Sequence, residues 1–167
     1  MVGIESEFPV YTASDAPMFG PECAPELADF VFDGSYTLGV FGGDAFADRT
    51  FANVTTPANL EITAPDVATY ALATPLDSAL DVTWEANGSA DDVVVLRLWD
   101  VNGNVLAVSA TDDGEFSIPP GDLGQLSPGL ATLTITRERG TRRSFGDGAG
   151  EVLITTRVEV WGYLDLQ

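Results

Sequence analysis

Acidic side chains that could bind a cation lie in two short stretches of the chain. The residues are Asp91, Asp92, Asp112, Asp113 and Glu115. Carboxylate oxygens are the ligands that calcium prefers, and the ion takes six or more of them. We therefore expect a calcium site here if the fold brings the two stretches together. The spacing matches no calcium-binding loop, however, and because adjacent aspartates often form turns, the turn-forming interpretation stays open.

Positive charge is concentrated in one segment of the chain. Residues 138–149 contain three of the seven arginines, Arg139, Arg142 and Arg143, followed by Phe145. Arginine offers paired donors to carboxylate and carbonyl groups, and arginine and aromatic residues are enriched at protein interfaces. We predict that these four residues form a binding loop for an acidic protein partner, including a second copy of this chain. In the alternative interpretation, the arginines pair with aspartates of the same molecule.

The composition excludes several functional classes. The chain has 26 acidic residues, seven arginines, no Lys, no His and a single Cys, and its net charge is −19. Without His it lacks Ser-His-Asp and Cys-His catalysis as well as the common zinc ligand sets. Without a basic stripe it is not expected to bind nucleic acid. We predict a protein that is not an enzyme and that needs no cofactor apart from the calcium considered above.

Carbohydrate is the alternative ligand. A pair of carboxylates can hydrolyse a glycosidic bond, but among 26 acidic residues such a pair arises by chance. Aromatic rings are the other argument. Trp84 shares a strand face with Leu80 and Val82 and is predicted to lie in the core, whereas Trp99 and Trp161 share faces with charged residues and are predicted to point outward or to contact the N-terminal region. The alternative function is a carbohydrate-binding module or a carboxylate-dependent hydrolase.

Apolar residues alternate with polar residues along the second half of the chain, which is typical of strands with one buried face. Turn residues separate six predicted strands, at 79–84, 92–99, 104–109, 115–118, 130–136 and 152–160. The dipeptide Asn102-Gly103 predicts a tight hairpin. Because successive antiparallel strands reverse direction, the loops at 86–91, 111–114 and 138–149 are expected at one end of the fold, together with all candidate site residues.

The chain is predicted to consist of two parts. Residues 1–76 form an irregular, strand-rich region in which Gly and Pro interrupt short apolar stretches. Residues 77–164 form an antiparallel β-sandwich, onto which the N-terminal region packs. The expected fold class is therefore all-β.

Several segments of the second part resemble one known family. They contain a strand Trp, an Asp-Asp-Gly-x-Phe turn and a Leu-x-Pro-Gly turn before a Thr-rich strand, within 80–84, 92–96, 112–119 and 126–137. Over residues 79–161 they resemble the immunoglobulin-like β-sandwich domains of secreted and lipid-anchored surface proteins from myxobacteria and related bacteria. The resemblance implies an immunoglobulin-like sandwich located outside the cytoplasm. The cysteine pair of antibody domains is missing.

Together these features predict a non-enzymatic interaction or structural module of a bacterial surface or secreted protein. A subunit of a surface assembly is a further alternative. No apolar run is long enough to span a membrane. The first residues lack the basic and apolar stretches of a secretory signal, so we expect that signal to be absent from this chain.

Overall fold

The described part of the protein is built almost entirely of β-strands. The computed structural model describes residues 2–5, 31–40, 48–67, 72–144 and 150–167. One short helix accompanies the strands in these ranges, and no helix there is long and apolar enough to cross a membrane. The prediction of an all-β protein is confirmed.

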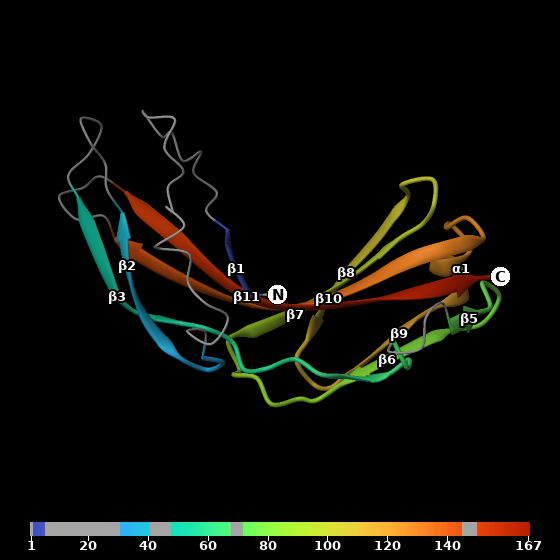
Figure 1. Cartoon of the computed structure of the whole chain (residues 1–167), viewed down its shortest axis with the longest axis horizontal. Helices are drawn as coiled ribbons and strands as arrows, with labels where there is room; N and C mark the ends of the chain where they lie inside the picture. Colours follow the sequence, from blue (N-terminus) through green and yellow to red (C-terminus); the bar gives the residue numbers. More distant parts are fainter. Residues whose placement is uncertain (1, 6–30, 41–47, 68–71, 145–149) are drawn as a thin grey trace, which may run out of the picture.

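The largest sheet contains six strands, five of them in the order β1-β11-β10-β7-β8. Their bounds are Val2–Glu5 for β1, Glu151–Leu166 for β11, Gly129–Ser144 for β10, Asp92–Trp99 for β7 and Val105–Thr111 for β8. Neighbours along this path are antiparallel, and a short strand, β5 (Leu72–Thr74), pairs with β11 in parallel. The hairpin of β10 and β11 runs through the whole molecule and connects its two ends (Figure 1).

A second sheet packs against one half of this hairpin. It has the order β4-β6-β9, with bounds Ile62–Ala64, Leu80–Trp84 and Glu115–Ile118. Every second side chain of β6, from Leu80 to Trp84, points into a core that both sheets share. Leu123 of the helix α1 (Pro120–Leu123) belongs to the same core. The fully or nearly fully buried residues of this core include Val82, Trp84, Val94, Leu96, Leu98, Ile118, Leu123, Leu133, Ile135 and Leu164. The prediction that Trp84 lies in the core is confirmed.

A two-stranded sheet packs against the other half of the hairpin. It consists of β2 (Ser35–Val40) and β3 (Arg49–Thr55). Phe51 and Val54 on β3 meet Val152 and Ile154 on β11 in a small second core. In Figure 1 these strands lie at the opposite end of the molecule from β5, β6 and β9. Among the described strands of the N-terminal region, β1 and β5 pair with β11, β3 packs against it, and β4 pairs with β6.

The hairpin is longer than the sequence predicts. Residues 138–149 are predicted to form a loop, but β10 continues as a strand through Ser144, and β11 extends to Leu166. The physical reason is that Val152 and Ile154 bury apolar surface against β3, and β10 pairs with this part of β11 without a register shift. The other predicted strands of the second half agree with the structure to within two residues.

Asp100 organises the turn between β7 and β8. Its carboxylate accepts hydrogen bonds from the backbone of Asn102 (2.8 Å) and Asn104 (2.9 Å), from the Asn104 side chain (2.7 Å) and from the backbone of Ser127 (2.8 Å). The hairpin predicted here forms with a three-residue loop, 101–103, in which Gly103 has a φ of +81° and Asn102 does not have a positive φ. Burial raises the pKa of Asp100, but the hydrogen bonds from Asn104, Ser127 and Asn102 together hold it well below its ordinary value. The turn is thus tied to the segment that leads into β10.

We expect Asp100→Asn to lower the melting temperature at pH 7. The folded-state pKa lies below the unfolded value of 3.8, so this carboxylate stabilises the fold above about pH 4 and loses the contribution as the pH falls further. The difference between wild type and variant should therefore shrink between about pH 5 and pH 2. Thermal unfolding followed by circular dichroism measures it, with Asp77→Asn, an exposed loop position, as the control. A difference that stays constant with pH would contradict this role.

Candidate functional site

Two arginines of β10 point into the molecule where the apolar core ends. Side chains alternate along a strand, so Arg137 and Arg139 lie on the same side as Leu133 and Ile135. Arg137 has no exposed surface (0%). Because a buried charge is costly unless it is paired and hydrogen-bonded, the surroundings of these two side chains decide whether they bind a partner or hold the fold together.

Arg137 is surrounded by acceptors from three other segments. Its Nε and Nη2 lie 2.8 Å and 2.9 Å from the two carboxylate oxygens of Asp112, although Nε–H does not point along its contact. The remaining acceptors are the carbonyls of Ala58 (3.4 Å), Asn59 (2.5 Å) and Glu85 (2.6 Å) and the side-chain oxygen of Asn87 (2.7 Å). The guanidinium therefore joins the chain before β4, the loop after β6 and the loop after β8.

Asp112 is as enclosed as its arginine. Its side chain is 4% exposed, and Oδ1 also accepts a hydrogen bond from Trp84 Nε1 at 2.7 Å. Gly88 lies directly against it, and a Cβ at this position would overlap Asp112 Oδ2 and come within 3.0 Å of Asp92 Oδ2. Glycine is thus required here by close packing against two carboxylates.

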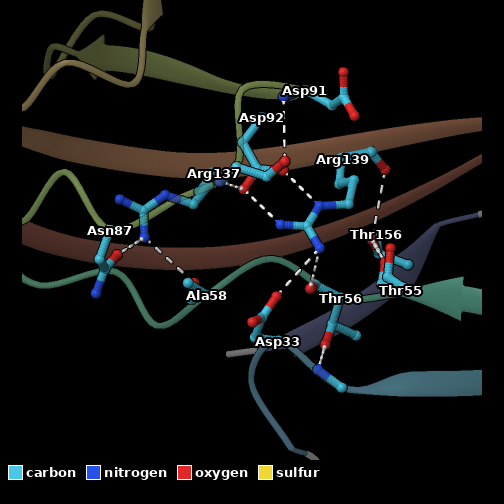
Figure 2. Close-up of polar contacts among 12 residues, drawn as sticks. Asp33, Thr55, Thr56, Ala58, Asn87, Asp91, Asp92, Arg137, Arg139 and Thr156 are labelled. Atoms are coloured by element: carbon cyan, nitrogen blue, oxygen red, sulfur yellow. Dashed lines mark hydrogen bonds and ion pairs between the residues drawn. The ribbon is translucent and has the colours of Figure 1, made fainter.

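A second ion pair lies beside the first. Arg139 binds Asp92 through two parallel contacts, Nε to Oδ1 at 2.6 Å and Nη2 to Oδ2 at 2.8 Å, and the Asp92 side chain is fully buried. Arg139 also donates to the carbonyl of Thr56 (2.9 Å) and reaches Asp33 (3.4 Å), as Figure 2 shows. The hydrogen bond to Asp92 raises the pKa of Arg139 further above its ordinary value. Ser89 donates its backbone N–H to Asp92 Oδ2 at 2.9 Å, so this oxygen accepts two hydrogen bonds.

The four residues of the predicted binding loop do not share one environment. Arg139 is occupied by Asp92, as described above. Arg142 is largely exposed and lies 3.9 Å from Glu151, while Arg143 donates to the carbonyl of Asn53 at 3.3 Å. Strand alternation places Arg142 on the opposite face of β10 from the other arginines, and Phe145 lies outside the described residues. For Arg139, the geometry matches the interpretation that arginines pair with aspartates of the same molecule.

The predicted calcium ligands are only partly brought together. Asp92, Asp112 and Asp113 line a pocket of about 300 Å³ together with Thr111 and residues 88–90. The loops at 86–91 and 111–114 therefore do meet, as strand order predicts. Asp91 is exposed, with its carboxylate turned away from the cluster (Figure 2), and Glu115 is exposed at the start of β9. Since the carboxylates of Asp92 and Asp112 face guanidinium groups, a calcium ion bound to them would have to displace the arginines.

The outer face of the large sheet exposes aromatic residues. Trp99 on β7 is 45% exposed and Trp161 on β11 is 51% exposed. The two strands that carry them flank β10. In the register of the sheet, Thr132 is paired with Trp99 on one side and with Tyr163 on the other, and Thr134 is paired with Trp161. The rings of Trp161 and Tyr163 meet edge to face, with centroids 5.4 Å apart. Of the two predicted placements, outward or against the N-terminal region, the exposure of both rings matches the outward one. We call the surface that they form the tryptophan face.

Comparisons with known proteins returned nothing: no family model, no curated protein and no solved structure matches the chain. The fold and the site by themselves define an all-β protein stabilised by two buried arginine–aspartate pairs, with an aromatic surface on its large sheet.

Sequence reasoning missed the central part played by Arg137 and its partner Asn87, and the close packing of Gly88 against Asp112. One signal was present, because Arg137 follows Leu133 and Ile135 at a spacing of two and so falls on the buried face of its strand. The acceptors carried no comparable signal, since three of them are backbone carbonyls.

We expect Arg137→Met to lower the free energy of unfolding by about 3–5 kcal/mol, because the buried carboxylate of Asp112 loses its counter-charge. Adding Asp112→Asn should recover part of the loss, since it removes the unpaired charge and leaves an oxygen for Trp84. Urea unfolding followed by tryptophan fluorescence measures both variants. Arg142→Met, at an exposed position of the same strand, is the control and should change stability by less than about 0.5 kcal/mol. Equal losses in Arg137→Met and Arg142→Met would contradict the buried pair.

Proposed function

We propose that the protein is a non-enzymatic interaction or structural module of a bacterial surface or secreted protein, and that it works outside the cytoplasm. One observation carries the proposal: the tryptophan face. Trp99 and Trp161 leave large apolar surfaces in water, and monomeric proteins seldom expose contiguous apolar patches without using them for binding. Aromatic residues are also the residues that contribute most at interface centres.

The charged cluster supports a structural rather than a catalytic role for the most enclosed polar groups. The carboxylates of Asp92 and Asp112 are each engaged by an arginine. A carboxylate acting as general acid or base must reach a substrate proton within hydrogen-bond distance. Two carboxylates that each face a guanidinium inside the fold are poorly placed for that chemistry, which argues for a protein that is not an enzyme.

Strand order supports the finer proposal of an immunoglobulin-like sandwich. The chain passes from β6 in one sheet to β7 and β8 in the other, returns to β9, and crosses again to β10 and β11. Immunoglobulin-like domains place their strands in two antiparallel sheets in such a Greek-key arrangement. Together with the resemblance of residues 79–161 to domains of secreted and lipid-anchored proteins, this order supports the proposed location outside the cytoplasm.

A carbohydrate-directed module is the second candidate, and the tryptophan face favours it as well. Trp99 and Tyr163 flank Thr132, whose hydroxyl side chain is partly exposed, in the register of the sheet. Ring faces and hydroxyl groups on a flat surface suit a sugar, which has apolar faces and polar edges. The ligand separates the two candidates, because an interaction module binds a protein surface and a lectin-like module binds a defined glycan.

We expect the double variant Trp99→Ala with Trp161→Ala to lose at least tenfold in affinity for the cell-envelope fraction of the producing bacterium. Cosedimentation of the purified chain with that fraction measures it. The control is Val101→Ala, an exposed apolar position outside the tryptophan face, which should bind as the wild type does. Unchanged circular dichroism and melting temperature exclude unfolding as the cause.

A glycan array with the same three proteins decides between the candidates. Micromolar binding of the wild type to a defined sugar, lost in the double tryptophan variant, would replace the proposed function by the carbohydrate-directed one. Failure of the wild type to bind either the envelope fraction or any glycan would overturn both.

A further inference from the structure

The described strands at the edges of the sheets are protected in the usual ways, with one exception. Natural proteins protect edge strands by covering them, by keeping them short, or with charges, bulges and prolines, because free backbone groups invite another strand to pair. On the outer side of β11, β1 pairs with residues 155–158 and β5 with residues 164–166. In the sheet β4-β6-β9, β4 has three residues and a register shift, and β9 has four residues with Glu115 in it and Pro119 after it. The pair β2-β3 contains a register shift, and β3 begins with Arg49.

Within the part of the chain that the structure describes, strand β8 has none of these protections. Its seven residues, Val105–Thr111, include no charge and no Pro, although the chain carries 26 acidic residues. It pairs with β7 without a register shift, and among the described residues it has no second neighbour. Val105 is 55% exposed. A regular, uncharged edge on a molecule of net charge −19 is the feature expected of a strand that pairs with a partner.

The phase of the hairpin shows which backbone groups face that edge. The N–H of Asp100 donates to the carbonyl of Asn104 at 3.1 Å, so this pair is hydrogen-bonded. Hydrogen-bonded and non-hydrogen-bonded pairs alternate along an antiparallel ladder, and the register between β7 and β8 is constant. The N–H and C=O groups of alternate β8 residues therefore point away from β7, namely those of Val105, Ala107, Ser109 and Thr111.

We propose that β8 pairs with β8 of a second copy of this chain, antiparallel and centred on Val108. The inference deepens the proposed function by naming the partner, and it rests on that proposal for its biological role. In this register Val105 lies opposite Thr111 of the partner copy and Ala107 lies opposite its Ser109. Each of the four outward-facing residues then has a partner with which it exchanges two hydrogen bonds. The large sheets of both copies become one continuous sheet with two-fold symmetry.

Charge favours the antiparallel orientation of two copies over a parallel one. The same register places Asp112 opposite Asn104 of the partner copy and Asp113 opposite its Gly103, so no acidic residue meets another across the ladder. A parallel arrangement would place Asp112 opposite its own equivalent, and like charges directly opposite are destabilising. At longer range two molecules of net charge −19 repel each other, and salt screens that repulsion. The dimer should therefore become more stable as the salt concentration rises.

The side chains of β8 suit such a pairing on both faces. Leu106 and Ala110 pack against the shared core, and Val108 lies on the same side between them. The central pair would therefore join Val108 of both copies beside the two cores. On the outer face Val105 is paired with Trp99, so the interface would begin next to the tryptophan face.

Two double variants at the same positions test the proposal, because residues 107 and 109 of opposite copies face each other. Ala107→Glu with Ser109→Glu brings like charges together in both pairs and should weaken dimerisation at least tenfold. Ala107→Lys with Ser109→Glu brings opposite charges together and should keep the dimer. Sedimentation velocity and light scattering from about 1 to 500 μM, at low and high salt, measure the association. The wild type should dimerise, more tightly at high salt.

Ala52→Glu with Ala79→Glu is the matched control. It adds the same two negative charges at exposed positions outside β8 and should leave dimerisation close to that of the wild type. The melting temperature of every variant shows that it folds. A wild type that stays monomeric at all concentrations and salt levels would overturn the proposal, as would equal behaviour of the Glu/Glu and Lys/Glu variants.

The dimerisation experiment and the binding tests of the proposed function can fail independently. A monomeric wild type that binds the envelope fraction through its tryptophan face overturns the dimer and leaves the proposed function standing. A dimer with the expected charge dependence that binds no envelope fraction and no glycan supports the pairing of β8 and overturns the proposed function.

Discussion

A guanidinium group without exposed surface has to find all of its partners inside the protein, and Arg137 finds them on three segments outside its own strand. Removing a charge from water costs several kcal/mol even after relaxation, so the fold is compatible with Arg137 only if these segments stay in place. Asp112 supplies the counter-charge, and the carbonyls of Asn59 and Glu85 supply the two shortest of the remaining contacts. The loops that connect the two sheets are thereby held by a single side chain of β10.

This constraint also explains how one hairpin serves two apolar cores. The core between the two larger sheets and the small core under β3 are separated along β10 and β11 by a layer of paired polar groups. Arg137 and Arg139 belong to this layer, and Thr156 of β11 donates to the carbonyl of Thr55 at 2.7 Å. Because both guanidinium groups of this layer lie against carboxylates and carbonyls, the strands pass from one core to the other across paired polar groups.

The distribution of charge shapes the outer surface as well. With a net charge of −19, contact with another acidic molecule is easiest where acidic residues are absent or paired with arginine. On the outer face of the large sheet, Arg97 lies 4.0 Å from Glu138, and Trp99 lies in the same strand as Arg97. Trp99 is paired with Val105 of β8, so the tryptophan face and the uncharged edge form one continuous region of the molecule.

Local sequence determined the strands of the second half, the Asn102-Gly103 turn and the burial of Trp84, because side-chain alternation and turn chemistry act between close neighbours. The tertiary structure alone decided the extension of β10, whose partner segment is stabilised by β3. It also decided the role of Arg137, whose contacts with Asn59 and Glu85 span 78 and 52 residues of sequence. A backbone carbonyl is present at every residue, so the residue types could not indicate which ones would receive a buried charge. That choice depended on which segments the two sheets bring together.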